Sequence, residues 1–201
     1  MLSAGGYGHV PLPLVKGELP WEPQRVFEQD VGFYGKIHHA RSAMLAEVQK
    51  ELGPLTYKHS MGHSWKAEMN ATKFNLAPRG YGRSSFRFSE SIQMGRVPVF
   101  MYDDIPWVPY NGTEIAAETF GFVCGLSVPS GEHSIRGVMG AMRSLGTEAY
   151  AQKLQALQRA RSYYTYDGVV AEIEKLLTDP FGPAGGHLRC DRHPKTERCC
   201  G

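Results

Sequence analysis

The stretch FNLAPRGYGRSSFRFSESIQMGRVPVFM, residues 74–101, decides the fold of this chain. It begins with a short apolar run at 74–76 and ends with a second apolar run at 97–101, each typical of a buried strand. Pro78 and Gly80 follow the first run and break the chain there. The two runs therefore predict two strands joined by a longer connection.

The connection between these strands carries the signals of a helix. Ser84 or Ser85 can cap a helix that runs from about residue 86 to residue 94, and Gly95 can stop it. Strand, glycine-containing loop, helix and strand in this order predict a parallel pair with a right-handed crossover.

The rest of the chain repeats this alternation of short apolar runs and helical periodicity. We expect a strand at 31–34, a helix at 37–52, a short turn at 65–71 that Ser64 can cap, and amphipathic helices around 135–145, 147–157 and 169–177. The predicted fold class is α/β, a Rossmann-like parallel sheet with helices on both faces.

Composition narrows the class of protein. The chain has 201 residues, 42% of them hydrophobic, which is typical of a globular protein. The chain has 22 Lys and Arg and 20 Asp and Glu, a net charge of +2. This small net charge argues against nucleic-acid binding by the surface as a whole. No stretch approaches the roughly 20 apolar residues of a membrane span, and no signal or anchor pattern is visible at the start.

Three segments follow from these patterns. Residues 1–25 are rich in proline and glycine and have no period, so we expect an irregular lead-in that lies on another surface. Residues 26–182 form the expected domain, and residues 183–201 a tail that contains Cys and His. Cys124, in the apolar run FGFVCGL, is predicted to be a buried thiol.

Positive charge is concentrated around the glycine-containing loop. Residues 73–96 hold five cations and one acid, a local net of +4, so the remainder of the chain sums to −2. Glycines let a backbone approach a ligand closely, helix N-termini attract anions, and arginine matches phosphate oxygens. We therefore predict a phosphate or diphosphate site at the carboxyl edge of the sheet, built from Gly80, Gly82, Arg83, Ser84, Ser85 and Arg87.

Three acidic residues near this loop have two interpretations each. Glu90 could accept both hydroxyls of a ribose, or it could form an i, i+3 salt bridge with Arg87 on a solvated face. Asp103 and Asp104 follow the strand at 97–101 and could face a donor sugar or a metal. The neighbouring prolines favour a turn-forming acidic pair, and we predict no metal site there.

Several of these motifs together resemble the exostosin-like glycosyltransferases. The central match is APRGYGRSSFR at 77–87, continued by Glu90, Gly95 and Val97-Pro98-Val99. The run YDDIPWVPY at 102–110 is similar to an algal and plant-like branch of that family, and VGFYGK at 31–36 resembles the first strand of its donor-binding half. The resemblance extends from about residue 10 to residue 195.

This resemblance implies a fold and a reaction. It implies the C-terminal, donor-binding half of a B-type glycosyltransferase, which transfers a sugar from a nucleotide sugar, by family expectation a uridine diphosphate (UDP) sugar, to a glycan or glycoprotein. Residues 80–85 would then contact the diphosphate, Arg87 would neutralise it and Glu90 would hold the ribose. The family also implies a Golgi location, no metal and no cofactor beyond the sugar donor.

The family's acceptor-binding half has no counterpart among the 30 residues before VGFYGK. The base that activates the acceptor usually comes from that half, so the catalytic base stays unassigned and a partner domain or chain is expected to supply it. The alternative is a non-catalytic nucleotide-binding or interaction module. A donor half should also expose an apolar rim for its partner, for which Trp21, Trp107 and Tyr110 are the candidates.

The tail allows three interpretations. Cys190, Cys199 and Cys200, with His187 and His193, contain enough ligands for zinc, but their spacing matches no closed structural site. A disulfide from Cys190 to Cys199 or Cys200 in an oxidising compartment and free thiols are the two better-supported alternatives.

Overall fold

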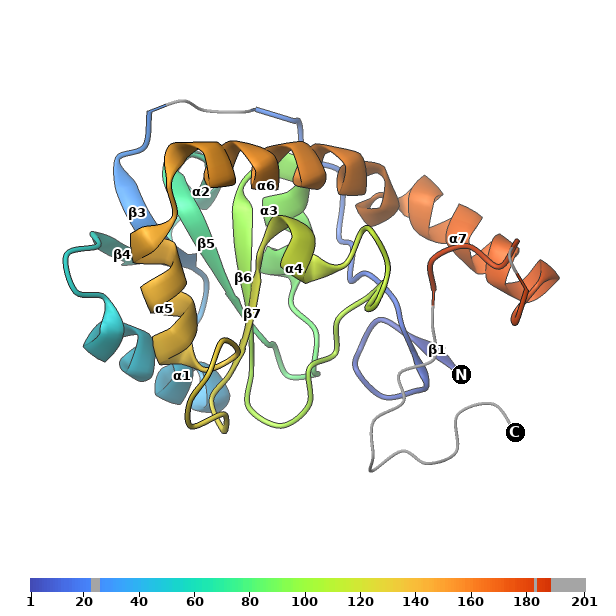
Figure 1. The fold of residues 1–201 in the computed structure, drawn as a ribbon, viewed down its shortest axis with the longest axis horizontal. Coiled ribbons are helices and arrows are strands. Elements are labelled where there is room, and N and C mark those ends of the chain that lie inside the picture. The colour runs from blue at the N-terminus through green and yellow to red at the C-terminus, as the bar shows by residue number, and fades with distance from the viewer. Residues whose placement is uncertain (23–25, 183, 189–201) are drawn as a thin grey trace.

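The computed structural model describes residues 1–22, 26–182 and 184–188. Its central sheet has five strands in the order β4-β3-β5-β6-β7, and every neighbouring pair is parallel (Figure 1). The strands are β3 (Gln29–Tyr34), β4 (Tyr57–Ser60), β5 (Thr72–Pro78), β6 (Val97–Tyr102) and β7 (Phe122–Gly125). The predicted α/β class with a parallel sheet is confirmed.

Helices alternate with these strands and cover both faces of the sheet. They are α1 (His39–Glu51), α2 (Trp65–Asn70), α3 (Phe86–Met94), α4 (Ala117–Phe120), α5 (Ile135–Ser144), α6 (Thr147–Ala160) and α7 (Tyr166–Thr178), with a 3-10 turn at Arg161–Tyr164. Helix α6 crosses one end of the strands, and α7 projects beyond the sheet (Figure 1). The helices predicted around 37–52, 86–94 and after residue 132 are all present.

The predicted β5–loop–α3–β6 unit forms as its local signals require. Gly95 ends α3 in the left-handed region, at φ 76°, where a residue with a Cβ would be strained. Along β6, Val97, Val99 and Met101 face one core while Phe100 faces the other, because side chains alternate along a strand. Both faces of β6 are buried, as expected for a central strand of a parallel sheet.

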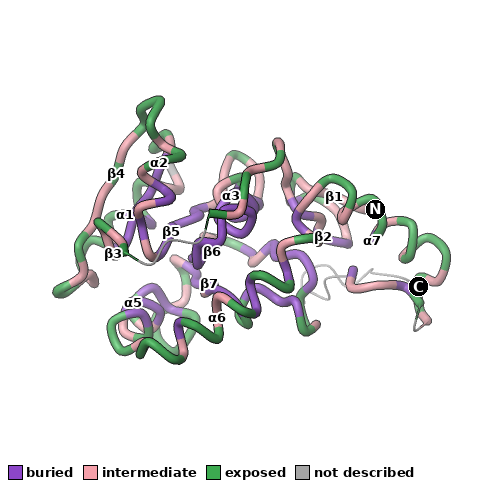
Figure 2. The backbone as a smooth tube through the Cα atoms, turned by 90° about the horizontal axis from the view of Figure 1, so that it is seen from above, coloured by how far each residue is buried: buried purple, intermediate pink, exposed green. Residues whose placement is uncertain are grey.

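Two large cores result among the described residues, one on each face of the sheet, beside a small cluster of Tyr34, Met69 and Met94. The core beneath α1 and α5 contains Val31, Phe74 and Cys124, and the core beneath α3, α4 and α6 contains Phe88, Phe100 and Phe120. Buried backbone is concentrated in the central strands and α3, whereas the outer surfaces of the helices are exposed (Figure 2). Cys124 is fully buried, which confirms that prediction.

The lead-in lies on the domain, as expected, but it is not wholly irregular. Its strands β1 (Leu2–Ser3) and β2 (Val10–Pro11) pair in parallel, and Val10 is buried against the core of α3 and α6. The three residues expected to form an exposed apolar rim do not form one. Trp107 and Tyr110 are 3% and 1% exposed, and Trp21 packs partly buried against the same core.

Candidate functional site

The strand order fixes where a ligand site is expected. From β3 the chain goes to one side, to β4, and then crosses to the other side of β3 to form β5 and the later strands. The sheet therefore has its topological switch point between β3 and β5, and open parallel sheets bind ligands outside the carboxyl ends of the strands at that point. The loop at 79–85 follows β5 and lies at this edge.

Two of the five cations counted in the sequence do not belong to this edge. Lys73 lies near the start of β5, where its ammonium is 4.9 Å from the ring of Tyr150. Arg96 immediately precedes β6, is fully buried and donates to the Asn70 side chain and to the carbonyl of Gly95. The starts of parallel strands lie at the opposite edge, so only Arg79, Arg83 and Arg87 remain beside the glycine loop.

Each of these three arginines forms an ion pair. Arg79 donates hydrogen bonds to both carboxylate oxygens of Asp103, from Nε and from Nη2, and the bond from Nη2 to Oδ2 is 2.7 Å long. Arg83 Nε donates to Asp104 Oδ2 at 2.8 Å. Asp103 and Asp104 therefore lie at the same edge as the loop, at the end of β6.

The pairing is reflected in the ionisation of the groups involved. Hydrogen bonding to Asp103 raises the pKa of Arg79. Burial acts to raise the pKa of Asp104, but the hydrogen bonds from Arg83 and from the Ile105 backbone lower it on balance. At this edge of the sheet, the charges of Arg79 and Arg83 are therefore largely balanced by those of Asp103 and Asp104.

The third pair joins Arg87 and Glu90 on α3. Arg87 donates to Glu90 and to the carbonyl of Tyr34 at the end of β3, and its guanidinium lies 4.0 Å from the ring centre of Trp65. The i, i+3 salt bridge therefore forms, but it is largely buried and not on a solvated face: the side chains are 19% and 9% exposed. Arg87 spans the switch point from α3 to β3.

Arg41 is a further cation at this point that sequence reasoning missed. It lies in the first turn of α1, donates to the carbonyls of Arg79 and Lys36 at 2.9 and 3.0 Å, and packs over the Phe33 ring. Burial and the neighbouring Arg87 lower its pKa. No carboxylate of the described chain forms an ion pair with it. A lone arginine in a predicted helix gave no signal in the sequence.

Ser85 occupies the position that precedes α3, but its side chain does not cap the helix. Its Oγ is buried, and it has no hydrogen-bond partner within the described residues. A buried hydroxyl without a partner is uncommon and calls for an explanation. Ser85 Oγ therefore lies at the N-terminus of α3 as an unused polar group.

The outer part of the glycine loop is covered by the lead-in. Gly5 and Gly6 accept hydrogen bonds from the Arg83 backbone N–H and from Arg83 Nη1, both 3.1 Å long, and Ala4 accepts one from Ser84 Oγ. A Cβ on Gly82 would lie 2.0 Å from the Gly5 carbonyl oxygen. Gly82 thus serves the approach of the lead-in, whereas Gly80 has ordinary space around it.

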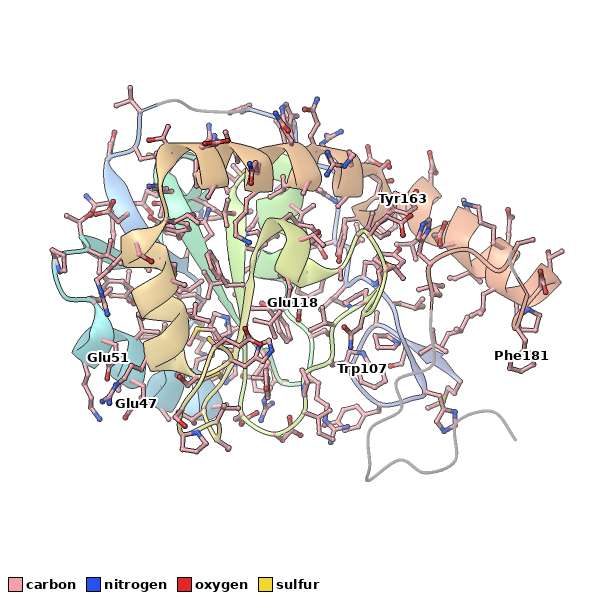
Figure 3. The ribbon with its side chains drawn as sticks, in the orientation of Figure 1. Glu47, Glu51, Trp107, Glu118, Tyr163 and Phe181 are labelled. Carbon is pink, nitrogen blue, oxygen red and sulfur yellow. The ribbon has the colours of Figure 1, made fainter. Side chains whose placement is uncertain are left out.

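A cavity of about 290 Å³ lies elsewhere, between α1 and the β7–α5 loop. Its lining includes Glu47 and Glu51 of α1, which Figure 3 labels, together with Leu126, Val128 and Arg136. None of its lining residues comes from the glycine loop. The two carboxylates in this lining do not suit a phosphate, and its one arginine, Arg136, already pairs with Glu51.

The remaining predictions on metals and membranes have these outcomes. Among the described residues, no group of three or more His, Cys, Asp or Glu is arranged to hold a metal ion. Within the same residues, no helix is long and apolar enough to cross a membrane. Cys190, Cys199, Cys200 and His193, on which the zinc and disulfide alternatives depend, lie outside the described residues.

Comparison with known proteins finds similarity to solved structures. No protein-family profile matches the sequence, and no curated protein matches it. The crystal structure of the GtfA/B complex contains a chain with a TM-score of 0.45 and 12% sequence identity, over 86% of this chain and 39% of that one. This chain therefore spans well under half the length of the matched chain.

Proposed function

We propose that residues 26–182 bind the diphosphate of a nucleotide sugar at the switch point between β3 and β5. The unit would serve as the donor-binding half of a glycosyltransferase of the exostosin-like family. Ser85 supplies the observation that carries this proposal, because its buried Oγ has no partner among the described residues at the N-terminus of α3. A phosphate oxygen there would accept a hydrogen bond from this hydroxyl and further hydrogen bonds from the first backbone N–H groups of the helix.

Two cations support an anionic ligand at this position. Arg41 carries a positive charge that no described carboxylate pairs, and it lies near Arg87, whose charge adds to burial in lowering the pKa of Arg41. Two like charges held close together are favoured when an anion lies between or beside them. In this proposal Gly80, Ser85 and Arg87 form the inner part of the diphosphate site, and Gly82, Arg83 and Ser84 form the outer part.

Glu90 would hold the ribose in this arrangement. Its carboxylate is nearly buried and bonded to Arg87, so the same pair can orient a ribose on one side and a phosphate on the other. Asp103 and Asp104 would act through Arg79 and Arg83, which they hold at the loop, on the side where a donor sugar would extend.

The wider assignment rests on the sequence resemblance. It comprises a UDP sugar as donor, a glycan or glycoprotein as acceptor, a partner domain or chain that supplies the acceptor half and the base, and a Golgi location. The competing proposal is a non-catalytic module, and one observation favours it: Arg79 and Arg83 of the loop and Arg87 of α3 already have carboxylate partners.

Titration calorimetry with UDP, without added divalent metal, tests the site. We expect binding to the wild-type protein and a loss of one to two decades in affinity for Arg87→Ala, since a hydrogen bond to a charged group contributes about 1.5–3 kcal/mol. Arg159→Ala, an exposed arginine on α6, is the matched control and should bind as the wild type. Equal affinities for all three proteins would reduce Arg87 to a structural ion pair and favour the non-catalytic module.

A further inference from the structure

A glycine-rich loop of the lead-in covers the outer part of the proposed diphosphate site. We call residues 4–8 the flap. Its carbonyl groups at Ala4, Gly5 and Gly6 accept hydrogen bonds from the Ser84 hydroxyl, the Arg83 backbone and the Arg83 guanidinium. These three donors are among those proposed to hold the diphosphate. The flap carbonyl groups and a phosphate would therefore compete for the same hydrogen-bond donors.

The fit between the flap and the glycine loop is close on both sides. A Cβ on Gly6 would lie 2.3 Å from the Arg83 Cβ, and a Cβ on Gly82 would lie 2.0 Å from the Gly5 carbonyl oxygen. Gly6 also has a φ of 92°, a conformation that other residues rarely adopt. Each segment therefore has a glycine where the other one lies against it.

The flap is anchored at its two ends, and between these anchors it makes few buried apolar contacts. At one end Ser3 accepts a hydrogen bond from Trp107 Nε1 at 3.1 Å, beside the lead-in in Figure 3, and at the other end Val10 is buried in the core. Between these anchors, Tyr7 is 63% exposed and its ring lies 5.4 Å from the Arg83 guanidinium. Segments with few buried apolar contacts open at low free-energy cost.

We infer that the flap is an internal competitor of the ligand: it closes over the glycine loop when the site is empty and must leave before a diphosphate can contact Arg83 and Ser84. This inference rests on the proposed function. Charge-assisted hydrogen bonds from Arg83 to phosphate are stronger than its bonds to neutral carbonyl groups, so a nucleoside diphosphate can displace the flap. The apparent affinity for the diphosphate is then the intrinsic affinity multiplied by the fraction of molecules whose flap is open.

The test opens the flap without substituting any of the proposed ligand-binding residues. Gly6→Ala introduces the clashing Cβ, and Gly17→Ala, at a lead-in glycine with nothing within 4 Å of its added Cβ, is the matched control. Tyr7→Ala is the second variant; it removes an exposed ring and leaves the core intact. Hydrogen exchange of the Arg83 amide, which donates to Gly5, reports the opening in the absence of nucleotide.

We expect Gly6→Ala to speed exchange of the Arg83 amide and to tighten UDP binding about tenfold. That factor corresponds to raising the open fraction from about one tenth to nearly all molecules. Tyr7→Ala should tighten binding about twofold to fourfold, as expected for loss of an exposed cation–π contact. Gly17→Ala should match the wild type in both measurements.

The other outcomes separate the two proposals. Faster exchange with unchanged or weaker UDP binding would overturn the flap as a competitor and leave the diphosphate site standing. Unchanged exchange in Gly6→Ala would show that the flap does not close on the loop, which overturns the inference directly. Faster exchange with no UDP binding by any of the proteins would reject the proposed function and the flap's role with it.

Discussion

Arg79 and Asp103 join the carboxyl ends of β5 and β6 through two hydrogen bonds, the longer of which, from Nη2 to Oδ2, measures 2.7 Å. Nη1 of the same guanidinium donates to the carbonyl of Gly80 at 3.1 Å, so one side chain holds both a neighbouring strand and the start of the glycine loop. The pair lies about four-fifths buried, at 21% and 22% exposure, where it is only partly screened by solvent.

Removing this pair should cost stability. We expect Arg79→Ala to lower the free energy of unfolding by about 1.5–3 kcal/mol, because Asp103 would keep a largely buried charge without its partner. Urea denaturation measures the change. In the double variant Arg79→Ala/Asp103→Ala, the combined loss should be smaller than the sum of the single losses; strict additivity would contradict coupling between the two residues.

Glu90→Gln should weaken the binding of UDP but not the binding of inorganic diphosphate. Gln keeps the shape of the side chain but loses the charge that is proposed to accept the ribose hydroxyls, so UDP affinity should fall about tenfold or more. Inorganic diphosphate has no ribose, and its affinity should stay within about twofold or rise, since a nearby negative charge has been removed. Calorimetry with both ligands compares them. A parallel loss for both would exclude a ribose-specific role of Glu90.

Arg41 should affect both ligands alike. Arg41→Met keeps a long side chain to pack on Phe33 but removes the cation that no described carboxylate pairs. We expect UDP and inorganic diphosphate to lose about tenfold in affinity each, because the lost interaction is with phosphate. Thermal unfolding of the variant serves as the control for its fold. Unchanged affinity for both ligands would confine Arg41 to holding the carbonyls of Lys36 and Arg79.

The two glycines of the loop should respond differently to alanine. At Gly80 the nearest atom to an added Cβ is the Ser84 carbonyl oxygen at 3.4 Å, so Gly80→Ala should change the free energy of unfolding by no more than about 0.5 kcal/mol. At Gly82 the Gly5 carbonyl oxygen leaves no room, so Gly82→Ala must push the flap away. Hydrogen exchange at Arg83 should therefore be faster in Gly82→Ala alone. Equal exchange in both variants would refute the close fit.

Stability should decline at alkaline pH. Burial raises the pKa of the Cys124 thiol from 9.0 to about 12 and that of the Tyr150 hydroxyl from 10.0 to about 12. Because both folded-state values exceed the unfolded ones, the stabilisation is complete below pH 9 and is lost as the pH rises towards 12. Urea unfolding from pH 7 to 11 measures the decline. Cys124→Ala should flatten its first part; an unchanged slope would exclude the thiol as its source.

The sequence determined the central unit of the fold because its signals are local. Glycine 95 ends α3 through its own backbone conformation, and the alternation along β6 follows from the geometry of a strand. The edge strand β4, Tyr57–Ser60, escaped prediction because its residues YKHS have no apolar pattern; pairing with β3 alone makes it a strand. Strand β7 was recognised only as an apolar run, since its partner β6 decides its conformation.

Some residues of the candidate site were also predictable from local sequence, and others were placed only by tertiary contacts. The sequence located the glycine loop, Arg87 and Glu90, which lie within a dozen residues of one another. Only the tertiary structure separated Lys73 and Arg96 from that cluster, added Arg41 from α1, paired Arg79 and Arg83 with acids more than 20 residues away, and laid the lead-in over Gly82. These contacts join segments that are distant in the chain, and strand order and register, not local propensity, decide which of them meet.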